Sequence, residues 1–302
     1  MIQNQGLYQT LLSQAEKLRK HNRQGSIQTK TRYYQAMQRF CGYLADEWRL
    51  QKLSNIAPKH IQAYTEHLKQ TNKSASTIKT DLAAIRFYHN LMSEPRHELP
   101  DNSTLSLKRR KFLGYNRAWS EEEFNLMHGY AIKAGRPDYA CAINLAYYAG
   151  LRIHECCRID TAMAEKILRD GCIAIPVNMT VKGKNGKIRI IPVNEIIKTD
   201  FRNLLETTAR GDKLIVLPGM KTHIYIKKLQ NFILYHRKKL PPREKKERLT
   251  FHGLRHAYAQ ARYNEFINQA MKPWEAKKAV SNLIGHERGD VTSIYLSCEE
   301  DE

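Results

Sequence analysis

The sequence predicts a mainly α-helical protein with one small β-sheet, an α+β fold arranged in two domains. Apolar residues recur at helical spacing through most of the chain, whereas residues 172–177 and 187–193 have the composition of β-strands. Residues 94–119 interrupt the periodicity with prolines and polar residues. The 302 residues, 42% of them hydrophobic, suffice for two cores. We therefore expect one domain at residues 1–112 and another at 118–302, with a linker at about 94–119.

Residues 1 to about 95 are expected to be mostly helical. The segment TKTRYYQAMQRFCGYL has apolar and aromatic residues at helical spacing. Pro58 suits the start of the next helix, where a residue without an N–H costs no hydrogen bond. Ser74 or Ser76 is a suitable N-cap for a third helix. The apolar stripe of that third helix, expected to face a helical core, consists of Ile78, Leu82, Ile85 and Tyr88.

The second domain is expected to begin with a helix, because Ser120 and Glu123 have the spacing of a capping box ahead of an apolar run. The following helix, in PDYACAINLAYYAG, is expected to end at Gly150, since glycine is favoured at a helix C-terminus. Asn185-Gly186 between the two β-like segments is a strong signal for a hairpin turn. From about residue 200 onward the pattern is helical again.

The charge distribution indicates a polyanionic partner. Lys and Arg number 50 against 30 acidic residues, which gives a net charge of +20. Residues 1–112 hold 19 basic and 8 acidic side chains, so both domains share the excess. The linker contains the run Lys108-Arg109-Arg110-Lys111, which is either a solvated surface or a segment that crosses phosphates. Ribosomal and membrane-surface proteins share this composition, but a nucleic acid held from two sides fits it best.

Several other classes of protein are disfavoured. The sequence has no run of about 18 apolar residues, so no membrane span is expected. MIQNQGLYQT lacks the organisation of a signal peptide, which favours a cytoplasmic location. None of the six cysteines forms a CxxC pair, so we expect buried thiols that pack as small hydrophobic groups, without structural zinc or disulfides.

The segment FHGLRHAYAQ gathers His252, Arg255 and His256 at helical spacing. A zinc site, a phosphate site and a solvated basic face are the three alternatives. A helical zinc protease site needs a glutamate after its first histidine, but Gly253 occupies that position, and a guanidinium would repel a dication. Arginine pairs bidentately with phosphate oxygens, and a histidine can add a further donor. The composition therefore favours a phosphate site, with no metal and no cofactor.

Three further segments complete a larger pattern. YAGLRIHE contains Arg152 and Glu155, VKGKNGKIRIIPV is the predicted hairpin, and LIGHERGDVTSIYL places His286 nine residues before Tyr295. In this combination the chain resembles the tyrosine recombinase family, the phage-integrase type of site-specific recombinase. Its signature is an arginine in a GLRxxE-like segment, a hairpin lysine, HxxR, GH, and a tyrosine nine residues later. The N-terminal half is similar to the helical core-binding domain of that family in general character.

The resemblance implies a role for each matching residue. Arg152 and Arg255 would hold the non-bridging oxygens of the scissile phosphate, with His252 and His286 as further donors. Tyr295 would be the nucleophile. Such residues suit phosphoryl transfer, because the reaction spreads negative charge over oxygens and depends on positioning and electrostatic stabilisation.

Proton transfer assigns further roles within the same resemblance. A tyrosine hydroxyl is a weak acid, so a base must ease its deprotonation, and His252 is our candidate. The hairpin lysine, which would protonate the leaving 5′ oxygen, corresponds to Lys184, eight residues before Pro192. Lys182 is the reserve candidate, because residues two apart share a strand face. Glu155 is either a residue that orients a catalytic histidine or arginine, or a plain surface carboxylate.

The resemblance also implies partners and a reaction. We expect a catalytic domain of the tyrosine recombinase type that acts on double-stranded DNA at specific sites, as a homo-tetramer on DNA, with or without accessory proteins. The 3′-phosphotyrosine intermediate conserves the bond energy, so neither metal nor ATP is needed. Integration of a mobile element is one such reaction. Two alternatives stay open at this point: a DNA-relaxing enzyme similar to type IB topoisomerases, and a catalytically inactive DNA-binding regulator.

Overall fold

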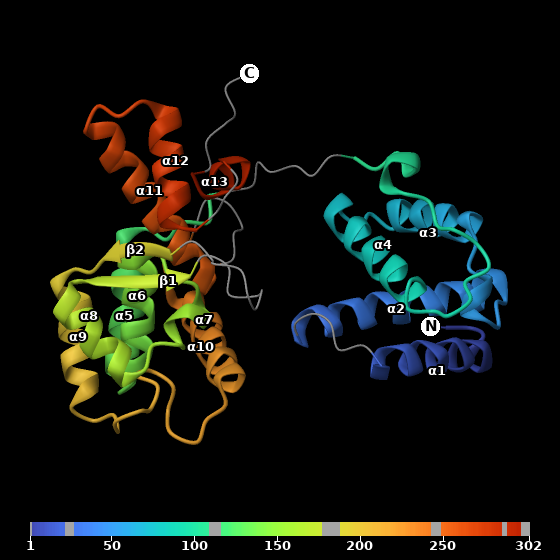
Figure 1. Cartoon of the computed structure of the whole chain (residues 1–302). Coiled ribbons are helices and arrows are strands. Elements are labelled where there is room, and N and C mark those ends of the chain that lie inside the picture. The colour runs from blue at the N-terminus through green and yellow to red at the C-terminus, as the bar shows by residue number, and fades with distance from the viewer. Residues whose placement is uncertain are drawn as a thin grey trace. The chain divides into compact units, whose positions relative to one another are not determined.

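The computed structural model describes residues 2–21, 27–108, 116–176, 188–242, 249–285 and 289–296. The chain folds into two compact units, Met1–Lys111 and Phe112–Glu302 (Figure 1). Within the described ranges, no helix has both the length and the apolar character needed to cross a membrane.

The first unit is helical, as predicted. Its elements are α1 (Gln5–His21), α2 (Ile27–Trp48), α3 (Pro58–Gln70) and α4 (Ala75–His89), with the 3-10 turns η1 (Leu53–Asn55) and η2 (Asn102–Leu105). Pro58 is the first residue of α3, and of the two serines considered it is Ser74 that caps α4, accepting a hydrogen bond from the Thr77 N–H. The predicted stripe of α4 is buried in the core that α1, α2 and α3 complete.

Part of the predicted linker packs against this first unit. The Arg96 N–H donates to the Ser54 carbonyl at 3.1 Å. The Arg86 guanidinium donates to the Pro100 carbonyl, and Leu105 is buried in the helical core. Residues 109–111 of the basic run lie outside the described residues.

The second unit combines helices with a two-stranded sheet. Its helices are α5 (Glu121–Lys133), α6 (Pro137–Ala149), α7 (Ile153–Cys156), α8 (Thr161–Asp170), α9 (Glu195–Leu205), α10 (Thr222–His236), α11 (Phe251–Asn268), α12 (Pro273–Leu283) and α13 (Gly289–Leu296), with the 3-10 turn η3 (Arg237–Lys239). The predicted capping box of Ser120 and Glu123 starts α5, and Gly150 ends α6 at a positive φ of 61°. These outcomes confirm the predicted helix ends.

The strands β1 (Cys172–Pro176) and β2 (Ile188–Pro192) pair antiparallel, with Cys172 opposite Pro192. Side chains alternate along each strand, so that Ile173, Ile175 and Ile191 face the core. The predicted turn at Asn185-Gly186 lies outside the described residues.

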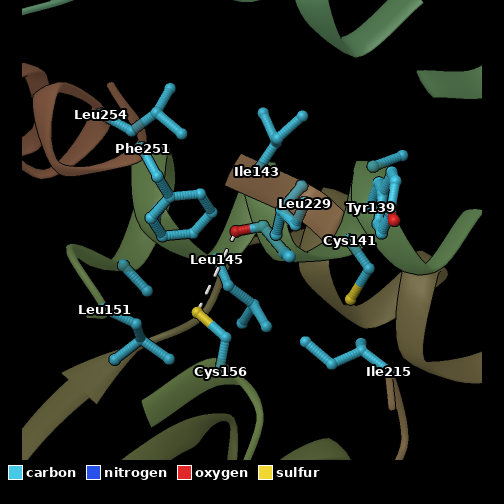
Figure 2. Packing of buried hydrophobic residues seen from close by; sticks show 14 of the residues in the cluster. Tyr139, Cys141, Ile143, Leu145, Leu151, Cys156, Ile215, Leu229, Phe251 and Leu254 are labelled. Atoms are coloured by element: carbon cyan, nitrogen blue, oxygen red, sulfur yellow. Dashed lines mark hydrogen bonds between the residues drawn. The ribbon is translucent and has the colours of Figure 1, made fainter. Parts of the chain in front are cut away.

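The core of the second unit is built around α6. Figure 2 shows Tyr139, Cys141, Ile143 and Leu145 of this helix packed with side chains from α10 and α11. Among the described cysteines, Cys41, Cys141, Cys156 and Cys157 are fully buried. The described cysteines are free thiols, which agrees with their predicted role as small hydrophobic groups.

Candidate active site

The helix α11 presents the predicted histidine and arginine cluster. Its start is fixed by Trp119, whose indole N–H donates to the carbonyl of the N-cap residue Thr250 at 2.9 Å. Gly253 allows this contact, because a Cβ there would lie 2.4 Å from the Arg117 carbonyl oxygen and 2.6 Å from the Trp119 ring. His252, at the exposed edge of the first turn, is thereby held in a defined place beside the buried Arg255.

Arg152 comes to the same place from the end of α6. The left-handed conformation of Gly150 turns the chain, and a Cβ at Gly150 would lie 2.4 Å from the Tyr258 ring. Arg152 is then the N-cap of α7, and its N–H donates to Oε2 of Glu155 at 2.7 Å. The Arg152 guanidinium also pairs with Oε1 of Glu155 at 3.0 Å, while a quarter of its side chain stays exposed.

Glu155 is the centre of a buried group of arginines. Besides Arg152, it pairs with Arg189 at 2.5 Å and lies 3.9 Å from Arg255. Burial alone would raise the pKa of Glu155, but Arg189, the Arg152 N–H and Arg255 bring that pKa below its usual value. Glu155 is therefore an ionised, buried carboxylate in contact with arginines, and the alternative of a plain surface carboxylate is wrong.

Arg189 is the member of this group that sequence reasoning missed. It lies on β2, where alternation places it on the same inward face as Ile191. Its guanidinium reaches Glu155 and also donates to the Leu283 carbonyl at 3.0 Å, near the end of α12. The alternation of KIRIIPV was a usable signal, because it assigns this arginine to the buried face.

Arg255 is 1% exposed and donates to the carbonyls of Gly150 and Ile284. These two bonds join the end of α6 to the end of α12 through one guanidinium. Burial, together with the positive charge of Arg152, lowers the pKa of Arg255 to about 10, so the side chain is still a cation at neutral pH. Its Nε has no hydrogen-bond partner among the described residues.

Tyr295, on α13, lies directly against α11. Its hydroxyl is 3.2 Å from Nε2 of His252, and the Arg255 guanidinium carbon is 5.7 Å from its ring centre. Although His252 reaches solvent, partial burial of its ring and the positive charges of Arg255 and Arg152 lower the pKa of His252 to about 4. A neutral imidazole and a phenol hydroxyl thus lie within hydrogen-bond distance beside two arginines.

A cleft of about 470 Å³ opens next to these residues. Its lining includes Arg152 and His252, together with Gln230 and Asn231 of α10 and Arg237 of η3. The predicted residues Lys184, Lys182 and His286 lie outside the described residues. The structure therefore brings together Arg152, Glu155, His252, Arg255 and Tyr295. Among the described side chains no group of three potential His, Cys, Asp or Glu metal ligands occurs.

Comparison with known proteins assigns the family. Residues 118–302 match the phage integrase family, and residues 16–94 match the N-terminal SAM-like domain of phage integrases. The chain belongs to the phage integrase family. This confirms the resemblance to tyrosine recombinases inferred from the sequence, and with it the class of site-specific recombinase.

Two curated tyrosine recombinases are similar in sequence to this phage integrase family member. A tyrosine recombinase of Thermosipho africanus is 23% identical over 291 residues, 93% of either chain. The tyrosine recombinase XerD of Shewanella oneidensis is 29% identical over 161 residues, which cover 51% of this chain and 47% of XerD.

Solved structures with the same fold include two DNA complexes. The Tn1549 transposon integrase in complex with a circular intermediate DNA aligns with a TM-score of 0.63 at 15% identity, over 94% of both chains. A lambda integrase dimer bound to a COC′ core site aligns with a TM-score of 0.62 at 18% identity, over 95% of this chain and 77% of lambda integrase. The predicted α+β fold of a two-domain integrase is thereby confirmed.

Proposed function

We propose that this recombinase cleaves and rejoins double-stranded DNA at specific sites through a covalent 3′-phosphotyrosine on Tyr295, without metal or ATP. The observation that carries the proposal is the 3.2 Å approach of the Tyr295 hydroxyl to Nε2 of His252, beside Arg255 and Arg152. A nucleophile, a base and two cations are the groups that metal-free phosphoryl transfer requires.

The scissile phosphodiester would bind in the cleft that Arg152 and His252 line. Arg152 is partly exposed, so it can bind a non-bridging oxygen. Arg255 is buried, with its Nε unpartnered in the described ranges, and we assign it to a second non-bridging oxygen by resemblance to the family. Glu155 keeps the two guanidinium groups near each other by offsetting their mutual repulsion. Negative charge that develops on the phosphate in the transition state is then stabilised by charges already in place.

His252 would activate the nucleophile. With a pKa lowered to about 4, its ring is neutral at physiological pH and can accept the Tyr295 proton. The Tyr295 oxygen attacks phosphorus, the bond from phosphorus to the 5′ oxygen breaks, and the phosphate stays on Tyr295. We assign the proton that the leaving 5′ oxygen takes up to Lys184, with Lys182 in reserve, and a further phosphate donor to His286.

Two domains and a net charge of +20 suit a protein that surrounds DNA. Strand exchange joins two duplexes with two protomers on each, so we propose a homo-tetramer on DNA. A lambda integrase tetramer bound to a Holliday junction shares this fold, with a TM-score of 0.59, and supports that assembly. We place the reaction in the cytoplasm, on chromosomal DNA or on the DNA of a mobile element.

The test is Tyr295→Phe, which removes one oxygen and keeps the ring. The substrate is a nicked duplex made from the DNA that flanks the gene, and cleavage of its recombination site traps a covalent protein–DNA adduct. We expect Tyr295→Phe to lose the adduct and keep DNA binding, and the wild-type adduct to form in excess EDTA. Tyr235→Phe, at a tyrosine that is 61% exposed, is the matched control and should behave as wild type.

An adduct formed by Tyr295→Phe would show that another tyrosine is the nucleophile. Chelation that abolished the wild-type adduct would contradict the metal-free mechanism. A recombinant product from two such duplexes separates a recombinase from a DNA-relaxing enzyme, which would change only supercoiling.

A further inference from the structure

Three residues on one face of α11 contact Tyr295. His252, His256 and Gln260 follow each other at intervals of four residues, and such residues lie above one another on a helix surface. Each contacts a different part of the tyrosine. His252 meets the hydroxyl, His256 meets the ring, and Gln260 meets the main chain.

The His256 ring stacks on the Tyr295 ring, with centroids 4.4 Å apart and planes inclined by 23°. His256 is 2% exposed, and burial lowers its pKa to about 3, an effect that His252 and Arg117 increase and a hydrogen bond with the Tyr295 backbone reduces. The ring is therefore neutral at physiological pH. A neutral stacked ring restrains the plane of a phenol without adding charge beside it.

Gln260 restrains the main chain of the same residue. Its amide N–H groups donate to the Tyr295 carbonyl at 3.2 Å and to the Asn116 side-chain oxygen at 2.9 Å. Asn116 belongs to the segment that enters the second unit, so Gln260 joins that segment to α13.

The helix that carries the nucleophile packs on a small apolar cluster. α13 has eight residues, and its described apolar side chains Tyr295 and Leu296 are buried in a cluster separate from the main core. The members of that cluster are Tyr258, Ala259, Val280, Ile284, Tyr295 and Leu296. A helix of two turns on so small a core needs directional contacts to fix one side chain, because a displacement of about 1 Å can cost a reacting group ~100-fold in rate.

We propose that His256 and Gln260 are positioning residues for Tyr295. His256 holds its ring and Gln260 holds its carbonyl, so that the Tyr295 hydroxyl contacts His252 and faces the phosphate. The inference rests on the proposed function of Tyr295. Neither residue touches the phosphate in this scheme, and both act through the nucleophile alone.

The test measures the rate of adduct formation on the nicked duplex together with the Kd for the same DNA. His256→Leu should lower the rate about 10- to 100-fold with an unchanged Kd, since a branched aliphatic side chain does not reproduce the stack. His256→Phe keeps an aromatic ring and should recover most of the rate. Gln260→Met keeps the length, removes the donors and should show a defect of the same kind.

A second readout separates positioning from a defect of the pocket or the fold. In a Tyr295→Phe background, hydrogen peroxide is supplied as the nucleophile. Cleavage then depends on the phosphate pocket and not on the contacts that position Tyr295. His256→Leu should leave that rate unchanged, whereas Arg152→Ala should abolish it.

Wild-type adduct rates in both His256→Leu and Gln260→Met would overturn the inference, as would equal losses with tyrosine and with peroxide. If His256→Leu does not fold, His256→Phe and Gln260→Met decide alone. Persistence of the adduct in Tyr295→Phe would instead contradict the proposed function, and is a separate outcome.

Discussion

Arg189 brings a permanent positive charge into the interior of the catalytic unit. Its side chain is 2% exposed, and it is held by Glu155 and by the Leu283 carbonyl, while its Nε has no hydrogen-bond partner among the described residues. The desolvation of such a pair is costly, and removal of one partner leaves the other charge buried. Three segments distant in sequence, β2, α7 and the end of α12, meet at this one guanidinium.

We therefore expect Arg189→Met to lower the free energy of unfolding by about 3–5 kcal/mol, the usual cost of breaking a buried ion pair. Arg189→Lys should retain part of the stability, because it keeps the charge without the planar fork. Urea denaturation gives both values. Arg202→Met is the matched control, since Arg202 is 56% exposed and 3.8 Å from Glu195, and it should change stability by less than about 0.5 kcal/mol. Equal effects at the two positions would contradict the role of burial.

The residues of the candidate site divide by how they could be predicted. His252, Arg255 and Tyr295 are part of motifs with fixed spacing, so the sequence alone indicates them and their proximity. The contact of Glu155 with arginines was expected only as one of two alternatives. Arg189 lies outside the recombinase signature, and its partner Glu155 is 34 residues away, so the pair depends on how the sheet meets α7.

At the scale of elements, the junction between α6 and α11 determines where Arg152 lies. The Tyr258 ring of α11 packs directly on Gly150, the left-handed residue that ends α6. The two helices can approach this closely because Gly150 has no Cβ. Gly135 has almost the same φ, 63° against 61°, but nothing lies within 4 Å of the place a Cβ would take. The two glycines therefore separate backbone strain from steric contact.

We expect Gly135→Ala to lower the free energy of unfolding by about 1–2 kcal/mol, because the left-handed conformation is unfavourable for an alanine. Gly150→Ala should cost more, by a further ~1–3 kcal/mol, because the Tyr258 ring must also move. It should also slow adduct formation by displacing Arg152, which Gly135→Ala should not do. Thermal denaturation and the adduct assay check both statements, and equal losses at the two glycines would refute the steric part.

Helices and their caps were largely readable from sequence, since they depend on neighbouring residues: Pro58, Ser74, Ser120 and Gly150 all have their predicted places. The small cluster that α13 shares with α11 and α12 was not. That cluster depends on which faces of α11, α12 and α13 meet, which local periodicity does not determine.

At the scale of the whole molecule, the excess of positive charge dominates. A net charge of +20 in two separate units means that DNA binding releases many condensed counterions. We expect the affinity for the recombination site to fall by about 10³-fold or more between 50 and 200 mM salt, as for proteins with at least six phosphate contacts. Fluorescence anisotropy measures the affinity at each salt concentration. An affinity that does not change with salt would contradict binding through phosphate contacts.

The state of assembly is a separate prediction. Sedimentation should show tetramers only with DNA.

The close contact at Gly253 has a consequence for evolution. Where a helical zinc peptidase carries a glutamate after its first histidine, this helix has no space even for a methyl group, because the entering chain at Arg117 and Trp119 occupies it. A mutation toward that glutamate would displace the segment that anchors the start of α11. The contact at Gly253 therefore disfavours the substitution that would convert this phosphate-binding helix into a metal-binding one, because the substitution would disrupt the packing at the start of α11.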